Sequence, residues 1–143
     1  MHDKAFGAWC NSAVVWLIKQ AMYPLLPRSA HLPGLADTDL DAFLVRLRRE
    51  SDVVFWTGLW LGALVFATTP LITLGVPLPA FLLPRRLLER HTARIIAHPI
   101  YVLRQALSVV RLIAGMCWGS DPRVRACFEL APYPADPGTF RQS

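Results

Sequence analysis

The feature that most constrains this chain is a long segment without any ionisable side chain, running from Val53 through Pro84. A bilayer core of about 30 Å needs about 20 apolar residues in a helix, and this segment supplies them. A chain of 143 residues can scarcely bury such a segment on all sides in water. We therefore predict a membrane span, and the alternative is the buried central helix of a soluble bundle.

Prolines limit how far a helix can run within this segment. Each proline removes a backbone donor and clashes with the preceding turn of a helix. The prolines are Pro70, Pro77, Pro79 and Pro84. We predict one span, from about Val53 to Leu74, followed by an extended apolar exit. A re-entrant loop is the alternative, because two crossings would need about 40 residues.

The start of the predicted span has features typical of a helix entering a membrane. Asp52 stands where its charge favours the positive end of the helix dipole. Aromatic side chains often anchor helices at the membrane interface. Those in the first two turns are Phe55, Trp56 and Trp60.

Gly58 and Gly62 form a G-x-x-x-G pair on this helix. Glycines at this spacing let another helix approach closely, and van der Waals contact then drives association in lipid. We predict a helix-packing face at these two residues. The alternative is chance, since glycine is common in membrane helices.

The chain before the span divides into two segments. Residues 1–34 hold a largely apolar stretch, Lys4–Tyr23, followed by a proline-rich connector. This stretch is short for a crossing, and we predict a helix lying at the membrane interface. Residues 35–52 are predicted to form an amphipathic juxtamembrane helix, with capping chemistry at Asp37–Asp39 and arginines near its end.

Residues 85–118, after the span, are basic and amphipathic. Apolar residues recur three and four positions apart from Pro99 to about Cys117, which indicates a helix. We predict that the arginines of this segment form a surface for lipid or a partner, because anionic headgroups attract them. They are Arg85, Arg86, Arg90, Arg94, Arg104 and Arg111. No nucleic-acid motif accompanies them, so we expect no nucleic-acid partner.

Residues 119–143 are predicted to form a short helix and an extended proline-rich tail. A helix stop and a new cap are indicated at Gly119–Pro122. Proline-rich segments lose little entropy on binding, so Tyr133 and Phe140 are candidates for docking on a partner. The alternative is a loose, solvated end.

A search for catalytic motifs yields no phosphate loop, no C-x-x-C pair and no H-E-x-x-H. We therefore expect no catalytic, cofactor-binding or metal-ligating residue, and no enzyme activity of the chain alone. One alternative is a haem-bearing electron-transfer subunit that uses His91 or His98, which are seven residues apart. Otherwise we interpret both as interfacial histidines.

The stretch HPIYVLRQALSVVRLIAGMCWGSDPRVRACFELAPYPADPGTF (98–140), with VPLPAFLLP (76–84) before it, carries a resemblance. It is similar to a small bacterial membrane protein associated with glucose–methanol–choline-type flavin dehydrogenases. The resemblance implies a short hydrophobic subunit that anchors a flavoprotein at the membrane. The flavin would belong to that partner, and no flavin-binding residue is implied here.

Taken together, the sequence predicts an all-α, single-span membrane protein with flanking interfacial helices and an extended tail. The predicted function is a non-catalytic anchoring or assembly subunit of a membrane-bound complex in the bacterial inner membrane. A flavin-dependent alcohol dehydrogenase is the candidate partner. The alternatives are a lipid-binding protein that uses its juxtamembrane arginines and a haem-bearing electron-transfer subunit.

Overall fold

A computed structural model describes residues 2–134, with side chains described from residue 12 onward. Over these residues the chain is all-helical, with 73% helix and no strand. The α-helices are α1 (His2–Met22), α2 (Leu40–Glu50), α3 (Val53–Thr68), α4 (Pro70–Leu74), α5 (Arg85–Ile96), α6 (Tyr101–Ser120) and α7 (Pro122–Cys127). Short 3₁₀ helices lie between them: η1 (Tyr23–Leu25), η2 (Leu35–Asp37) and η3 (Ala80–Leu82).

Aspartates begin three of these helices by accepting a hydrogen bond from a backbone N–H of the first turn. The Asp39 carboxylate accepts from the N–H of Ala42 at 3.1 Å and begins α2. Asp52 does the same at the start of α3, and Asp121 at the start of α7. The helix starts predicted at these aspartates are therefore confirmed, since a carboxylate satisfies an N–H that has no partner inside the helix.

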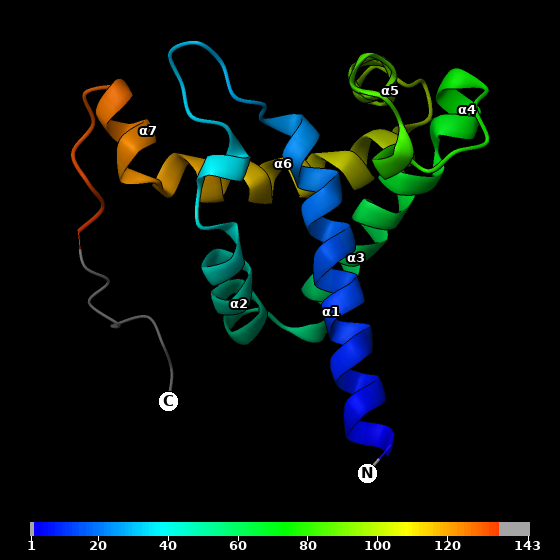
Figure 1. Cartoon of the computed structure of the whole chain (residues 1–143), viewed down its shortest axis with the longest axis horizontal. Coiled ribbons are helices and arrows are strands. Elements are labelled where there is room, and N and C mark those ends of the chain that lie inside the picture. The colour runs from blue at the N-terminus through cyan, green and yellow to red at the C-terminus, as the bar shows by residue number, and fades with distance from the viewer. Residues whose placement is uncertain (1, 135–143) are drawn as a thin grey trace.

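The core lies where α1, α3 and α6 meet. Figure 1 shows α6 running across the view while α1, α2 and α3 extend below it. Helices α1 and α6 both pack against α3. The large side chains at this junction are fully buried, among them Ile18, Met22, Leu59, Phe66 and Val110. Helix α1 thus contributes to this core, and the predicted interfacial position of residues 4–23 stays a prediction.

Helices α3 and α4 together make one helix long and apolar enough to cross a membrane, Val53–Leu74. Within its apolar window, 44% of the residues are buried inside the chain, and the others are partly or fully exposed. The predicted bounds of the span agree with this range. Helices α5 and α6 do not form a second straight span, because their axes are bent by 116°.

The aromatic residues at the start of α3 do not share one environment. Trp56 is 6% exposed and packs in the core, with the Arg48 guanidinium 5.3 Å from its ring centroid. Trp56 lies on the face of α3 that points into the core, together with Leu59 and Phe66. The prediction that Trp56 anchors the helix at an interface is wrong; Phe55 is exposed and Trp60 half-buried.

Candidate functional site

The most unusual feature of the apolar helix is the break at Pro70, between α3 and α4. In a regular helix the carbonyl of Phe66 would accept from the N–H of residue 70, which proline lacks. The Nε2 atom of His91, on α5, lies 2.9 Å from this carbonyl oxygen. The hydroxyl of Thr69 is 3.5 Å from it and bonds the Val65 carbonyl more closely, at 2.7 Å. His91 therefore supplies the donor that Pro70 removes.

This contact fixes the tautomer of His91. A carbonyl oxygen only accepts, so Nε2 carries the hydrogen and Nδ1 of the neutral ring is an acceptor. The Thr73 hydroxyl lies 2.6 Å from Nδ1 and donates to it. The same hydroxyl is 3.1 Å from the Thr69 carbonyl, but it has one hydrogen and the shorter contact takes it.

A second carbonyl near the end of the broken helix is also satisfied by α5. The residue four positions after Thr73 is Pro77, which again has no N–H. Arg94 donates from Nη1 to the Thr73 carbonyl oxygen at 2.6 Å. A cation at this point also favours the negative end of the helix dipole. Helix α5 thus caps the broken helix twice, through His91 and through Arg94.

His91 is fully buried, which corrects the prediction of an interfacial histidine. Its ring packs against that of Phe66, with centroids 4.7 Å apart. Burial lowers the pKa of His91, and the hydrogen bond to the Phe66 carbonyl offsets part of that effect. The ring is therefore held neutral. A haem iron would have to displace one of its two hydrogen bonds.

His98 lies apart from this cap, in the turn between α5 and α6. Its Nδ1 atom accepts from the backbone N–H of Ile100 at 3.2 Å. His98 is half-buried and bonded within its own turn, whereas both ring nitrogens of His91 are engaged inside the cap.

The glycine pair of α3 is split between two environments. A Cβ atom added at Gly62 would lie 2.7 Å from the Ala106 carbonyl oxygen and 2.9 Å from Cγ2 of Val110. Gly62 thus permits the close approach of α6 within the chain. A Cβ added at Gly58 would meet nothing within 4 Å, and Gly58 is exposed.

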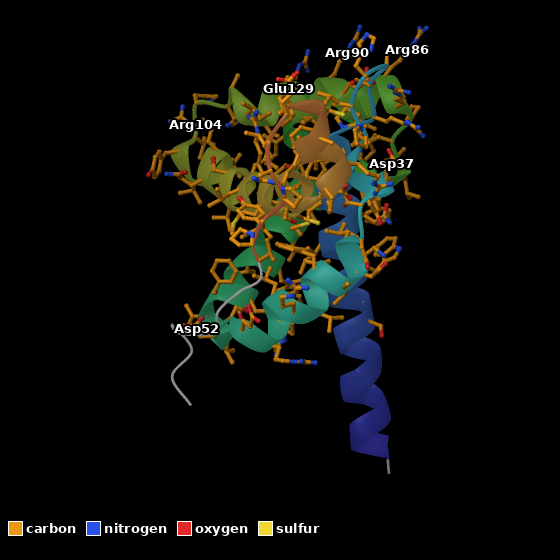
Figure 2. All side chains as sticks on the ribbon, turned by 90° about the vertical axis from the view of Figure 1, so that its left-hand side faces the viewer. Asp37, Asp52, Arg86, Arg90, Arg104 and Glu129 are labelled. Carbon is orange, nitrogen blue, oxygen red and sulfur yellow. The ribbon has the colours of Figure 1, made fainter. Side chains whose placement is uncertain are left out.

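The predicted arginine surface also divides. Arg85 forms an ion pair with Glu89 at 2.9 Å, and Arg94 donates a hydrogen bond to the Thr73 carbonyl. Arg86 and Arg90 project from the outer side of α5 at one end of the molecule (Figure 2).

On α6 the two predicted arginines are exposed and lie away from the cap. The Arg104 guanidinium lies 5.9 Å from the ring centroid of Tyr101, a contact within the same helix. Arg111 borders a shallow groove with Ser108 and Gly115. These arginines and those of α5 therefore do not make one continuous site.

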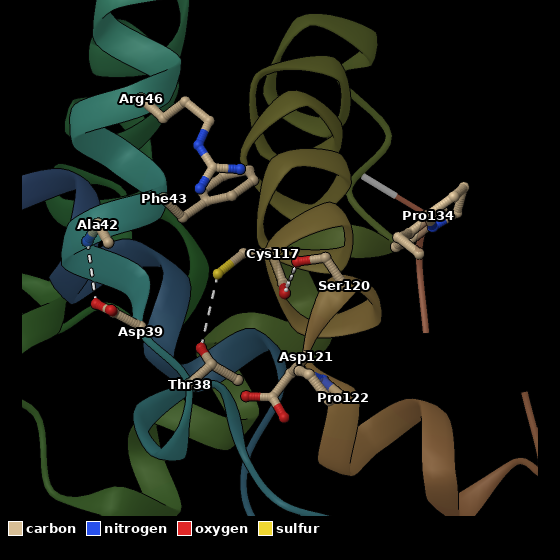
Figure 3. Close-up of a pocket in the computed structure, with 11 residues that line it drawn as sticks. Thr38, Asp39, Ala42, Phe43, Arg46, Cys117, Ser120, Asp121, Pro122 and Pro134 are labelled. Atoms are coloured by element: carbon tan, nitrogen blue, oxygen red, sulfur yellow. Dashed lines mark hydrogen bonds between the residues drawn. The ribbon is translucent and has the colours of Figure 1, made fainter. Parts of the chain in front are cut away.

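A hollow of about 640 Å³ lies between the start of α2 and the end of α6 (Figure 3). Most of its polar groups are already engaged. Asp39 and Asp121 cap helices, and the Thr38 hydroxyl donates to the Leu35 carbonyl at 2.7 Å. The Cys117 thiol points at Thr38, with Sγ and Oγ1 3.6 Å apart. Burial raises the pKa of this thiol, which keeps it protonated and unreactive at neutral pH.

The start of the predicted docking tail folds back toward the body of the chain. Tyr133 and Pro134 line the hollow just described. The Arg125 guanidinium lies 4.1 Å from the ring centroid of Tyr133, within the range of a cation–π contact. Tyr133 is nevertheless 66% exposed. Phe140, the other residue predicted to dock, lies outside the described residues.

Among the described residues, no group of three or more His, Cys, Asp or Glu side chains is placed to hold a metal ion. Comparisons with protein-family models, with curated proteins and with solved structures find no match to this chain. The resemblance to a dehydrogenase-associated membrane protein therefore stays a prediction.

Proposed function

We propose that this chain is a membrane-embedded, non-catalytic subunit that anchors or assembles a membrane-bound complex. The observation that carries the proposal is an apolar outer stripe on the candidate span, left exposed by the rest of the chain. The exposed large side chains of the span are Val53, Val54, Phe55, Leu61, Leu71 and Ile72. A helix that is apolar all round belongs in a core or in lipid, and the core covers only the inner side of this one.

The polar side chains on this stripe support a lipid environment. The hydroxyl of Thr57 donates to the Val53 carbonyl at 2.7 Å, and that of Thr68 donates to the Leu64 carbonyl at 2.9 Å. Both hydroxyls are therefore satisfied by their own helix. Such self-contained hydrogen bonding is what a hydrocarbon environment requires, because it offers no water as a partner.

The assembly part of the proposal is supported by Gly58, which lies on the same exposed stripe, one turn from Leu61. Its bare backbone offers a place where a partner helix could approach closely. The identity of the partner rests on the resemblance alone. In this proposal the partner is a flavin-dependent alcohol dehydrogenase that carries the flavin, in the bacterial inner membrane.

The first test places a charge on the stripe. Leu61→Arg should reduce recovery of the chain in membranes, because a central arginine costs about 2.5–3.5 kcal/mol on insertion scales. The matched control is Val45→Arg on α2, where Val45 is 62% exposed outside the span. Equal membrane recovery of both variants, or recovery of the wild-type chain in a detergent-free high-speed supernatant, overturns the proposal.

The second test concerns the partner. The tagged chain, solubilised from its native membranes, should co-purify with a flavoprotein identified by its flavin absorption. Gly58→Leu should weaken that association. The same change at Gly119, where an added Cβ also meets nothing within 4 Å, should preserve it. Purification of a folded chain without any partner overturns the assembly role.

A further inference from the structure

Two of the four arginines of α5 form no ion pair or hydrogen bond with the described part of the chain. The guanidinium of Arg85 pairs with Glu89, and that of Arg94 caps the Thr73 carbonyl. Arg86 and Arg90 are exposed, and no described residue forms an ion pair or hydrogen bond with either side chain. In Figure 2 both extend away from the body of the molecule at its upper end.

The position of these two arginines on α5 is unfavourable for the isolated chain. They stand four residues apart, so the like charges are neighbours on one helix face, an arrangement that destabilises a helix. Arg86 also lies in the first turn, which has no acidic residue to match the positive end of the dipole. An external anion would relieve both effects.

The surroundings of α5 indicate where that anion would come from. Helix α5 packs against α4, at the end of the candidate span (Figure 1). The connection from α4 to α5 exposes Leu78, Phe81 and Leu82. An apolar belt followed directly by arginines is the pattern of a segment at the membrane interface, with the charges at headgroup level.

We propose that Arg86 and Arg90 together bind the phosphate of an anionic phospholipid headgroup at this end of the span. A guanidinium presents several N–H donors in one plane, which match phosphate oxygens. The inference rests on the proposed membrane location, but it assigns the lipid contact to two of the six arginines that the sequence pattern grouped together.

The test measures thermal unfolding of the purified full chain in a neutral detergent, with phosphatidylglycerol or phosphatidylcholine added. A ligand that binds only the folded state raises the unfolding midpoint. Phosphatidylglycerol should raise it by several degrees more than phosphatidylcholine, and added salt should reduce the difference. Arg86→Gln/Arg90→Gln should abolish the difference, whereas Arg86→Lys/Arg90→Lys should retain part of it.

The matched control is Arg46→Gln/Arg49→Gln on α2, which removes the same charge from two other exposed arginines and should keep the full response. An equal response of the Arg86/Arg90 variant and the wild type overturns the inference. So does an equal response to the two lipids, or an equal response to inorganic phosphate, which would indicate a free-anion site. Membrane recovery of the Arg86→Gln/Arg90→Gln variant should be unchanged, so the proposed function and this inference fail separately.

Discussion

The Nε2 atom of His91 lies 2.9 Å from the Phe66 carbonyl oxygen, which Pro70 leaves without its regular backbone donor. The imidazole N–H of His91 thus replaces the backbone donor that Pro70 lacks. This hydrogen bond is buried, and a buried carbonyl without a partner costs about 1–3 kcal/mol. We expect the packing of α5 against the end of the α3–α4 helix to depend on this contact for its stability.

The first prediction concerns the loss of the donor. His91→Leu should lower the free energy of unfolding by about 1–3 kcal/mol, because the buried Phe66 carbonyl loses its donor, whereas the Thr73 hydroxyl can still donate to the Thr69 carbonyl. His91→Gln should cost less, since its amide N–H can reach the position of Nε2. Thermal or denaturant unfolding in detergent measures both. Equal losses for the two variants would show that packing, and not the hydrogen bond, matters here.

The second prediction tests the link between the proline and the histidine. Pro70→Ala restores a backbone N–H four residues after Phe66, so the carbonyl regains a donor without His91. His91→Leu should therefore cost less in the Pro70→Ala background than in the wild type. A double-mutant cycle should give a coupling of about 1 kcal/mol. Additive losses would mean that the two residues act independently.

The third prediction is a pH dependence of stability. Burial lowers the pKa of His91 below its ordinary value of 6.5. The unfolded chain takes up a proton on this ring as the pH falls through about 6.5, while the folded chain keeps the ring neutral. The unfolded state then binds more protons, so the free energy of unfolding should fall as the pH drops below 6.5.

His91→Gln is the control for this pH dependence, because glutamine does not titrate. The difference in unfolding free energy between wild type and His91→Gln should shrink as the pH falls from 7.5 to about 5, a range chosen to span the ordinary histidine pKa. Other titrating groups cancel in this comparison. A difference that stays constant over the range would contradict a neutral, buried His91.

The fourth prediction separates the two glycines of α3. Gly62→Ala should destabilise the chain by about 1–3 kcal/mol, because the new methyl group meets backbone and a Val110 methyl at under 3 Å. Gly58→Ala has open space and should be neutral or stabilising by up to about 1 kcal/mol, given the higher helix propensity of alanine. Unfolding of the two variants side by side measures this. A larger loss for Gly58→Ala would reverse the assignment.

Local features of the fold were predictable because their causes are local. Asp52 and Asp121 begin helices through contacts two or three residues away, and the uncharged run defines the candidate span. Pro70 even identifies which carbonyl must lose its donor. The sequence does not say what replaces that donor, because His91 lies 25 residues from Phe66 and only the packing of α5 brings it there.

The same limit explains the other differences between prediction and structure. The spacing of Gly58 and Gly62 marks both as positions of close approach, but only the path of α6 decides that Gly62 is used within the chain. A cluster of arginines looks uniform in sequence. Only the position of the Thr73 carbonyl separates Arg94, which caps a helix, from Arg90, which does not.

The cap on the broken helix also makes two separate segments of the chain depend on each other during folding. Until α5 packs against α4, the carbonyls of Phe66 and Thr73 lack the donors that His91 and Arg94 supply. In hydrocarbon each of these would cost several kcal/mol. In the proposed membrane location, the end of this helix therefore needs water as a hydrogen-bond partner until α5 has folded back onto it.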